Sequence, residues 1–149
     1  TIFSPLKGKL LKLKDSKDEA FASESLGKGA LILPEEGKVV APINGTVTTV
    51  TPTLHAIGLT SDNGIEILIH IGINTVELNG KYFKSTLKEG DKVSIGDTLI
   101  EFDIDSIVKE GYSIESPIVI VNTDEYSDIL AIEDAANINY KDLILTVIK

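Results

Sequence analysis

The sequence predicts an all-β fold, an antiparallel β-sandwich or flattened barrel that carries one or two short helices. Turns that contain glycine recur between short stretches rich in Ile, Val, Leu and Thr, a spacing typical of all-β domains. Three similar stretches each enter a predicted strand through a proline, which strands tolerate at an edge or at their first residue: Ser4-Pro5-Leu6, Ala41-Pro42-Ile43 and Ser116-Pro117-Ile118. At 149 residues the chain can bury a sizeable core and fits a single domain, 1–149.

The most regular predicted strand lies within 64–76. Successive side chains of a strand point to opposite faces, so residues of one parity share a face. One parity here consists of isoleucines and predicts a buried face: Ile65, Ile67, Ile69, Ile71 and Ile73. The other parity carries Glu66, Leu68, His70, Gly72 and Asn74. His70 is therefore expected to point outward from a rigid strand.

The other elements follow from similar patterns. Further strands are predicted at 26–33, 38–41, 46–50, 53–59, 92–95, 118–121 and 143–148. Residues 15–22 are polar and predict a loop in which Phe21 stands alone. Short helices are expected at 105–110 and 123–130, the first capped by Asp103 or Asp105 and ended by Gly111, the second capped by Asn122 or Thr123.

Composition excludes several classes of function. The formal net charge of −9 argues against nucleic acid and anionic membranes as partners and suits a basic protein. Cysteine is absent, which excludes disulfides and thiolate chemistry. Methionine is also absent, so we expect either a processed start or a domain cut from a longer polypeptide.

No apolar run approaches membrane-spanning length, and lysines interrupt the first apolar residues. We therefore expect a cytoplasmic protein, either free-standing or the cytosolic domain of a membrane permease.

The chain has two histidines, His55 and His70, 15 residues apart. That separation suits neighbouring strands joined by a turn at 61–64. The two imidazoles could then flank one anion, one acting as nucleophile and the other as hydrogen-bond donor. Thr53 has the parity to hydrogen-bond His55. On spacing alone, each histidine also fits an ordinary surface or core residue, and Thr53 fits a plain strand threonine.

Other kinds of site find little support. The sequence has no GxGxxG motif, no Walker loop and no HxH or HExxH motif, and two histidines leave a tetrahedral zinc ion short of ligands. We therefore expect no intrinsic cofactor or metal. Residues 41–47 and 89–99 resemble biotinyl- and lipoyl-carrier domains, which carry a modifiable lysine at a hairpin tip. The tip at 62–64 has no lysine. A carrier domain of this kind is therefore kept only as an alternative to the paired-histidine site.

The stretch 64–76 carries a more specific resemblance. Its pattern is Gly, two residues, three apolar residues, His, apolar, Gly, apolar, any residue, Thr, apolar. It resembles the phosphohistidine signature of the glucose-type A component (glucose/β-glucoside/sucrose family) of the bacterial phosphoenolpyruvate-dependent sugar phosphotransferase system. Nearly the whole chain resembles this family, including 4–8, 18–22, 26–29, 40–47, 53–56, 76–80, 96–103, 116–118 and 121–122.

The resemblance implies a phosphotransferase component that drives sugar uptake. His70 would accept a phosphoryl group from the histidine-containing phosphocarrier protein and pass it to a cysteine of a sugar-specific B component. His55 corresponds to the second active-site histidine, Thr53 to the threonine that orients it, and Gly72 to a backbone neighbour of the phosphorylated ring. The alternative within this fold is a regulatory domain of a sugar transporter.

The resemblance also places a partner-binding surface around the histidines. From the residues themselves we expect Phe21, Leu68 and Val50 to supply an exposed apolar patch rimmed by acids, Asp18 among them. Asn74 stands where the family often has Asp, which removes one acid that would meet a partner arginine. The pair His55 and His70 is expected to bind zinc only when a partner supplies a carboxylate.

Overall fold

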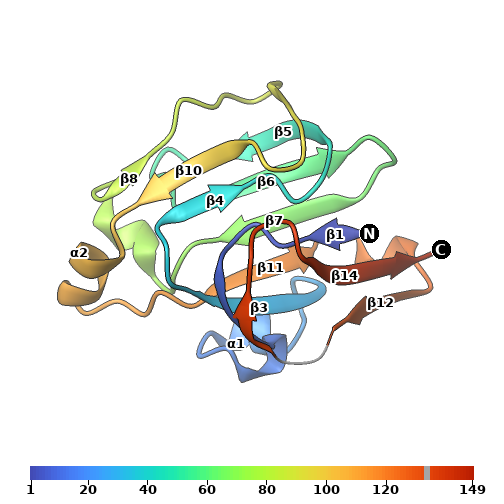
Figure 1. The fold of residues 1–149 in the computed structure, drawn as a ribbon, viewed down its shortest axis with the longest axis horizontal. Coiled ribbons are helices and arrows are strands. Elements are labelled where there is room, and N and C mark those ends of the chain that lie inside the picture. Colours follow the sequence, from blue (N-terminus) through green and yellow to red (C-terminus); the bar gives the residue numbers. More distant parts are fainter. Residues whose placement is uncertain (133–134) are drawn as a thin grey trace.

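The computed structural model describes residues 1–132 and 135–149. Its strands form three antiparallel sheets (Figure 1). The strands are β1 (Ile2–Phe3), β2 (Gly8–Lys12), β3 (Lys28–Pro34), β4 (Lys38–Val40), β5 (Gly45–Val50), β6 (Ala56–Ser61), β7 (Glu66–His70), β8 (Phe83–Lys84), β9 (Lys92–Val93), β10 (Thr98–Phe102), β11 (Ser116–Ile120), β12 (Asp128–Ala131), β13 (Ala135–Ile138) and β14 (Leu143–Ile148). Two short helices, α1 (Glu19–Ala22) and α2 (Ile104–Lys109), lie outside the sheets.

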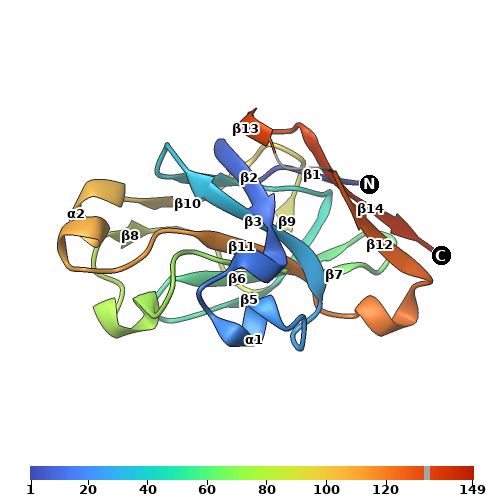
Figure 2. The ribbon, with the colours of Figure 1, turned by 90° about the horizontal axis from the view of Figure 1, so that it is seen from below.

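The largest sheet has the strand order β13-β2-β3-β11-β7-β6-β5-β9. Two smaller sheets have the orders β4-β10-β8 and β1-β14-β12. The view from below shows the strands stacked in layers, with α1 beneath the large sheet and α2 at one end of the molecule (Figure 2). This arrangement confirms the predicted antiparallel β-sandwich.

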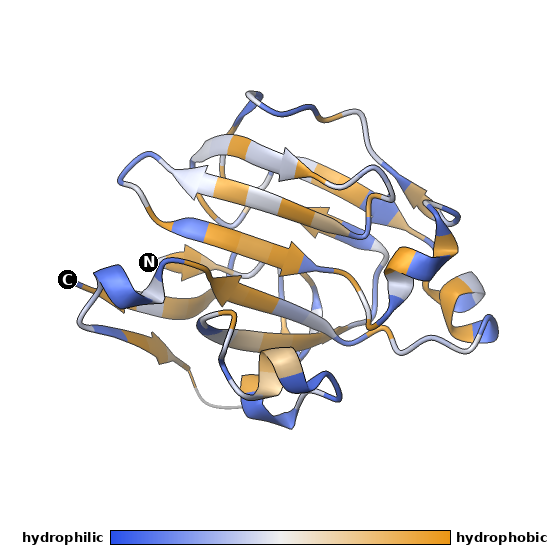
Figure 3. Ribbon diagram, turned by 180° about the vertical axis from the view of Figure 1, so that it is seen from behind, coloured by the Kyte–Doolittle hydropathy of each residue, from blue (hydrophilic) through white to orange (hydrophobic). Residues whose placement is uncertain are grey.

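The core lies between the sheets, and strand β7 is one of its main contributors. All five isoleucines of the predicted buried face are at most 9% exposed. Strand β7 is flanked by β11 and β6, so its ladder hydrogen bonds are made on both edges. Apolar residues concentrate in the strands and polar residues in the turns (Figure 3). The outer face of β7 is thereby held rigid by burial of its inner face.

Three predicted elements differ from the structure. Residues 15–22 are not simply a loop, because α1 forms there with Asp18 as its cap; the Asp18 carboxylate accepts from the Ala20 amide at 3.0 Å. The predicted helix at 123–130 is wrong: a single 3₁₀ turn, Thr123–Glu125, is followed by strand β12. Pairing of β12 with β14 satisfies the backbone there and overrides the weak local helix signal.

The predicted strand at 53–59 begins only at Ala56, because a turn occupies 52–55 and Leu54 adopts φ +58°. Helix α2 is confirmed. Asp103 caps it by accepting from the Ser106 amide at 3.1 Å, and Gly111 follows with φ +96°.

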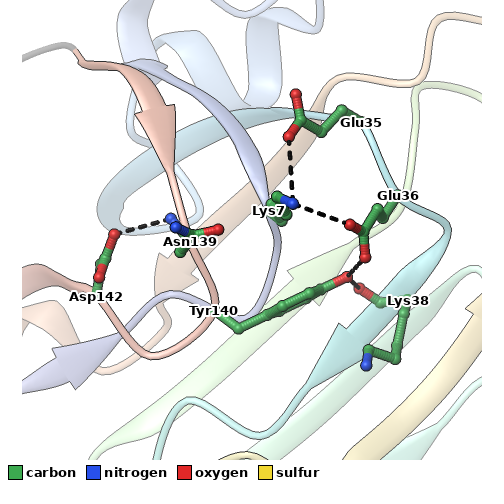
Figure 4. Close-up of polar contacts among 7 residues, drawn as sticks. All are labelled: Lys7, Glu35, Glu36, Lys38, Asn139, Tyr140 and Asp142. Atoms are coloured by element: carbon green, nitrogen blue, oxygen red, sulfur yellow. Dashed lines mark hydrogen bonds and ion pairs between the residues drawn. The ribbon is translucent and has the colours of Figure 1, made fainter.

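A polar cluster fastens the segment before β14 to the turn between β3 and β4 (Figure 4). The Tyr140 hydroxyl lies 3.3 Å from both the Glu36 carboxylate and the Lys38 carbonyl oxygen. Lys7 pairs with Glu36 at 3.1 Å, and the Lys38 ammonium lies 4.9 Å from the centre of the Tyr140 ring. Burial and the Glu36 charge raise the pKa of Tyr140 to about 12, so the phenol keeps its proton.

Candidate functional site

The two histidines come together at the open end of the β6–β7 hairpin. His70 is the last residue of β7 and pairs with Ala56, the first residue of β6. His55 precedes Ala56, and its carbonyl oxygen accepts from the Ile71 amide at 2.7 Å. The two ring centres are 5.0 Å apart and the ring planes are nearly perpendicular, at 78°. The predicted neighbouring strands and the predicted pairing of the imidazoles are both present.

One nitrogen of His70 is fixed by the backbone. Its Nδ1 lies 2.7 Å from the Gly72 carbonyl oxygen. Because a carbonyl oxygen can only accept, Nδ1 carries the proton in the neutral ring, which leaves Nε2 with a free lone pair. Gly72 itself adopts φ +74°, and a Cβ there would lie 2.6 Å from the Thr75 methyl and 2.8 Å from the Ser113 carbonyl. Only glycine fits this backbone position.

His55 is held by a threonine-rich turn. The Thr53 hydroxyl lies 2.5 Å from His55 Nδ1. The Thr51 hydroxyl lies 3.4 Å from the same nitrogen, but it also donates to the Ala56 carbonyl at 3.1 Å. Thr53 reaches His55 from the turn rather than from the strand on which we expected it. Its contact with the ring is nonetheless the predicted one.

Both imidazoles are expected to be neutral near pH 7. His55 is 8% exposed, and burial together with the His70 charge lowers its pKa to about 4. Burial also lowers the pKa of His70, while the Gly72 carbonyl and the Asp18 charge oppose that shift. A neutral imidazole with a free nitrogen is the nucleophilic form of histidine.

The predicted partner-binding residues divide into buried and accessible ones. Phe21 is only 3% exposed and packs with Leu13 and Val119, so the prediction that its ring lies on an exposed patch is wrong. Helix α1 turns the ring inward, and its centre lies 5.2 Å from that of His70. Leu68 is half-buried beside it.

Asp18 and Asn74 flank the site differently. Burial lowers the pKa of His70 and the charge of Asp18 partly opposes that shift, which places this acid within electrostatic reach of the ring. Asn74 is exposed and adopts φ +61°, a left-handed conformation that asparagine tolerates better than most residues.

Two residues that contact the surroundings of the site, and a third farther along the same sheet face, were not predicted from the sequence. Glu115 accepts from the Lys17 amide at 3.0 Å, and Ser116 accepts from the Gly72 amide at 3.3 Å. Val121 is 53% exposed and shares the parity of Val119, which pairs with Leu68. A parity argument along 116–121 would have placed Val121 on the face of His70. No local signal indicates the contacts of Glu115 and Ser116.

Neither a metal cluster nor a membrane span is found in the part of the chain that the structure describes. Within 1–132 and 135–149, no group of three or more His, Cys, Asp or Glu side chains could hold a metal ion. No helix within these same ranges is long and apolar enough to cross a membrane.

A β-sandwich with paired neutral histidines at the open end of a hairpin within its largest sheet defines a class of small domain suited to phosphoryl or proton transfer on imidazole. Comparison with known proteins identifies the family. Residues 1–126 match the family model described as phosphoenolpyruvate-dependent sugar phosphotransferase system, EIIA 1. The chain belongs to this family, as its sequence signature predicted. The match favours this assignment over a biotinyl or lipoyl carrier.

Individual relatives agree with the family model. The chain is 52% identical over 126 residues to the PTS system beta-glucoside-specific EIIBCA component of Bacillus subtilis (strain 168), covering 85% of this chain and 21% of that protein. It is 42% identical over 146 residues to the PTS system glucose-specific EIIA component of Staphylococcus aureus (strain COL), covering 98% of this chain and 88% of that protein. The chain thus spans only about a fifth of the length of the beta-glucoside relatives.

A solved structure shows the same fold. Glucose permease IIA from Mycoplasma capricolum is similar with a TM-score of 0.85 at 31% sequence identity, covering 99% of this chain and 94% of that one.

Proposed function

We propose that this domain carries a phosphoryl group on His70 between two protein partners of a sugar phosphotransferase system. The observation that carries the proposal is the His70 ring, whose Nδ1 is committed to the Gly72 carbonyl while Nε2 stays free. The lowered pKa of the ring keeps that nitrogen unprotonated near pH 7. Membership of the EIIA family supports the same role.

Transfer to His70 requires positioning rather than elaborate covalent chemistry. His70 Nε2 attacks the phosphorus of the donor's phosphohistidine, so one N–P bond forms as the donor's N–P bond breaks. The donor in this proposal is the histidine-containing phosphocarrier protein. In the onward step, a cysteine thiolate of a sugar-specific B component attacks the same phosphorus. The S–P bond forms as the N–P bond to His70 breaks, and the His70 imidazole leaves.

His55 would stabilise the phosphoryl group while it resides on His70. With Thr53 as the donor to Nδ1, the neutral His55 ring keeps its proton on Nε2 and can offer it to a phosphoryl oxygen. Its pKa of about 4 makes the His55 ring neutral in the unphosphorylated domain. The bond remains charge-assisted because a phosphoryl group carries nearly two negative charges at neutral pH.

The surroundings of His70 suit docking of successive protein partners. Leu68 is a half-buried apolar residue on the face of His70, and Val121 is an exposed one farther along that face, beside Glu66. The Asp18 charge lies within electrostatic reach of the ring. The net charge of −9 favours basic partners through long-range steering. Asn74, with no charge of its own, is expected to contact a partner without pairing with an arginine.

A zinc ion fits this site only in part. His55 and His70 offer two imidazoles, while zinc takes four ligands. We therefore propose that zinc would bind only where a partner completes the ligand set, with these two rings as the protein's share.

The regulatory alternative rests on the same chemistry with a different consequence. Relatives described as EIIBCA components show that such a domain occurs within larger chains. If the natural chain instead joins this domain to a secondary transporter, phosphorylation of His70 would tune transport rather than energise it.

The test is reconstitution with phosphoenolpyruvate, the first enzyme of the system and its phosphocarrier protein, followed by intact mass spectrometry. The wild-type domain should gain one acid-labile phosphoryl group, and His70→Ala should gain none. His55→Gln should still be phosphorylated but should pass the group on more slowly in a rapid-quench assay. A full phosphoryl gain by His70→Ala would overturn the proposal.

A further inference from the structure

Glu115 is an unusual residue for its surroundings, because its carboxylate is buried beside the site. The buried polar side chains among the described residues are Ser4, His55, Ser61, Thr75, Glu115 and Ser116, and Glu115 is the one acid in this set, at 6% exposure. A buried carboxylate is costly unless it is hydrogen-bonded. Glu115 accepts from the backbone amide of Lys17 at 3.0 Å, across 98 residues of sequence.

The Lys17 amide lies at the entrance to helix α1. The next residue, Asp18, caps the helix by accepting from the Ala20 amide. Helix α1 has four residues and carries Phe21, whose ring centre lies 5.2 Å from that of His70. The backbone bond to Glu115 therefore fixes the point from which both the Asp18 charge and the Phe21 ring are directed at His70.

Ser116, the next residue, holds the backbone of Gly72, to which the His70 ring is bonded. Its hydroxyl donates to the Ile114 carbonyl at 2.9 Å and accepts from the Gly72 amide at 3.3 Å. The Gly72 carbonyl in turn accepts from His70 Nδ1. Two consecutive residues at the start of β11 thus hold the two backbone segments that contact the His70 ring.

We propose that Glu115 is a positioning residue for phosphoryl transfer, which holds α1 against His70 through the Lys17 amide while Ser116 holds Gly72. The effect on transfer rests on the proposed function of His70; the effect on the ring's surroundings does not. Geometry is the reason for the expected size of the effect, since a misplacement of about 1 Å at a reacting group can cost on the order of 100-fold in rate.

Two substitutions separate hydrogen bonding from charge and volume. Glu115→Gln keeps an oxygen that can accept from the Lys17 amide but removes the charge. Glu115→Met keeps a side chain of similar length but removes the acceptor, which leaves the Lys17 amide without its partner. Tyr140→Phe is the control, because it removes a polar tie to the β3–β4 turn rather than to either histidine.

The first readout is the NMR spectrum of the unphosphorylated domain. In the wild type the Lys17 amide should be protected from hydrogen exchange. The chemical shifts of the His70 ring protons should differ from those of a free histidine because of the ring current of the neighbouring Phe21. Glu115→Met should expose the Lys17 amide and move the His70 signals toward those of a solvent-exposed histidine. Glu115→Gln and Tyr140→Phe should leave both unchanged.

The second readout is the rate of phosphoryl acceptance from the phosphocarrier protein. Glu115→Met should slow it by on the order of tenfold or more, with Glu115→Gln near the wild-type rate. An unprotected Lys17 amide in the wild type would overturn the proposal even if Glu115→Met failed to fold. Unchanged His70 signals in a folded Glu115→Met, or equal losses in Glu115→Gln and Glu115→Met, would also overturn it.

These outcomes are distinct from failure of the proposed function. If the wild-type domain accepts no phosphoryl group, the function is wrong whatever the spectra show. If it accepts one while Glu115→Met behaves like the wild type, only the positioning role is wrong.

Discussion

Replacing His55 by glutamine should flatten the acid dependence of the domain's stability. A histidine whose pKa is lowered on folding binds a proton more readily in the unfolded chain. Its contribution is therefore complete above the unfolded pKa of about 6.5 and is lost as the pH falls toward the folded pKa. For His55 that folded pKa is about 4, mainly because the ring is buried. Glutamine has no such titration.

The structure sets the size of this effect. A fall from 6.5 to about 4 corresponds to about 3 kcal/mol of unfolding free energy at about 1.4 kcal/mol per pKa unit. His55 as a whole residue is 8% exposed, but its ring titrates beside His70, so about 3 kcal/mol is the upper limit of the effect. Between pH 7.5 and pH 5, linkage gives a loss of about 2 kcal/mol from this one group.

Urea denaturation of both proteins at several pH values in that range measures the difference directly. The carboxylates titrate in both proteins, so they cancel in the comparison. We expect the unfolding free energy of the wild type to fall by about 2 kcal/mol more than that of His55→Gln. Parallel curves for the two proteins would show that His55 is not held neutral by burial, and the reasoning would fail.

Further predictions concern other parts of the molecule. Phe21→Ala should lower the unfolding free energy by about 3–5 kcal/mol, and a urea midpoint near that of the wild type would show that the ring is not buried. Gly72→Ala should cost on the order of 1–3 kcal/mol for the left-handed backbone and should slow phosphorylation, so a fully active variant would contradict the fixed role of the Gly72 carbonyl. Tyr140→Phe should cost about 1 kcal/mol in the same urea assay, and a neutral effect would mean that the cluster in Figure 4 adds nothing to stability. The dialysed domain should hold no stoichiometric zinc by elemental analysis, whereas tight retention would show a ligand set beyond the two histidines.

Much of the fold follows from local patterns in the sequence. Alternation of isoleucines along 65–73 is decided by burial of one face, so it predicts both the strand and its orientation. Helix α2 was predictable because its cap, Asp103, and its stop, Gly111, lie next to it in sequence. The helix expected at 123–130 failed because pairing with β14, a distant partner, decides the conformation of residues 128–131.

The contacts of the site likewise divide into those that could be predicted from nearby residues in the sequence and those that depend on the tertiary fold. His55 and His70 could be paired from their separation because a hairpin brings residues of known spacing together. The contact between Thr53 and His55 was expected from strand parity but arises from a turn, since the two residues are close in sequence in either case. Burial of Phe21 and the bonds of Glu115 and Ser116 depend on tertiary contacts across many residues, which periodicity does not report.

The most direct test of the central claim is to locate the phosphoryl group on the phosphorylated domain. Long-range proton–nitrogen correlation of the ¹⁵N-labelled protein, together with phosphorus coupling, distinguishes the four ring nitrogens of the two histidines. Because the Gly72 carbonyl holds His70 Nδ1, we predict phosphorus bound to Nε2 of His70. Phosphorus on Nδ1 of His70, or on either nitrogen of His55, would contradict it.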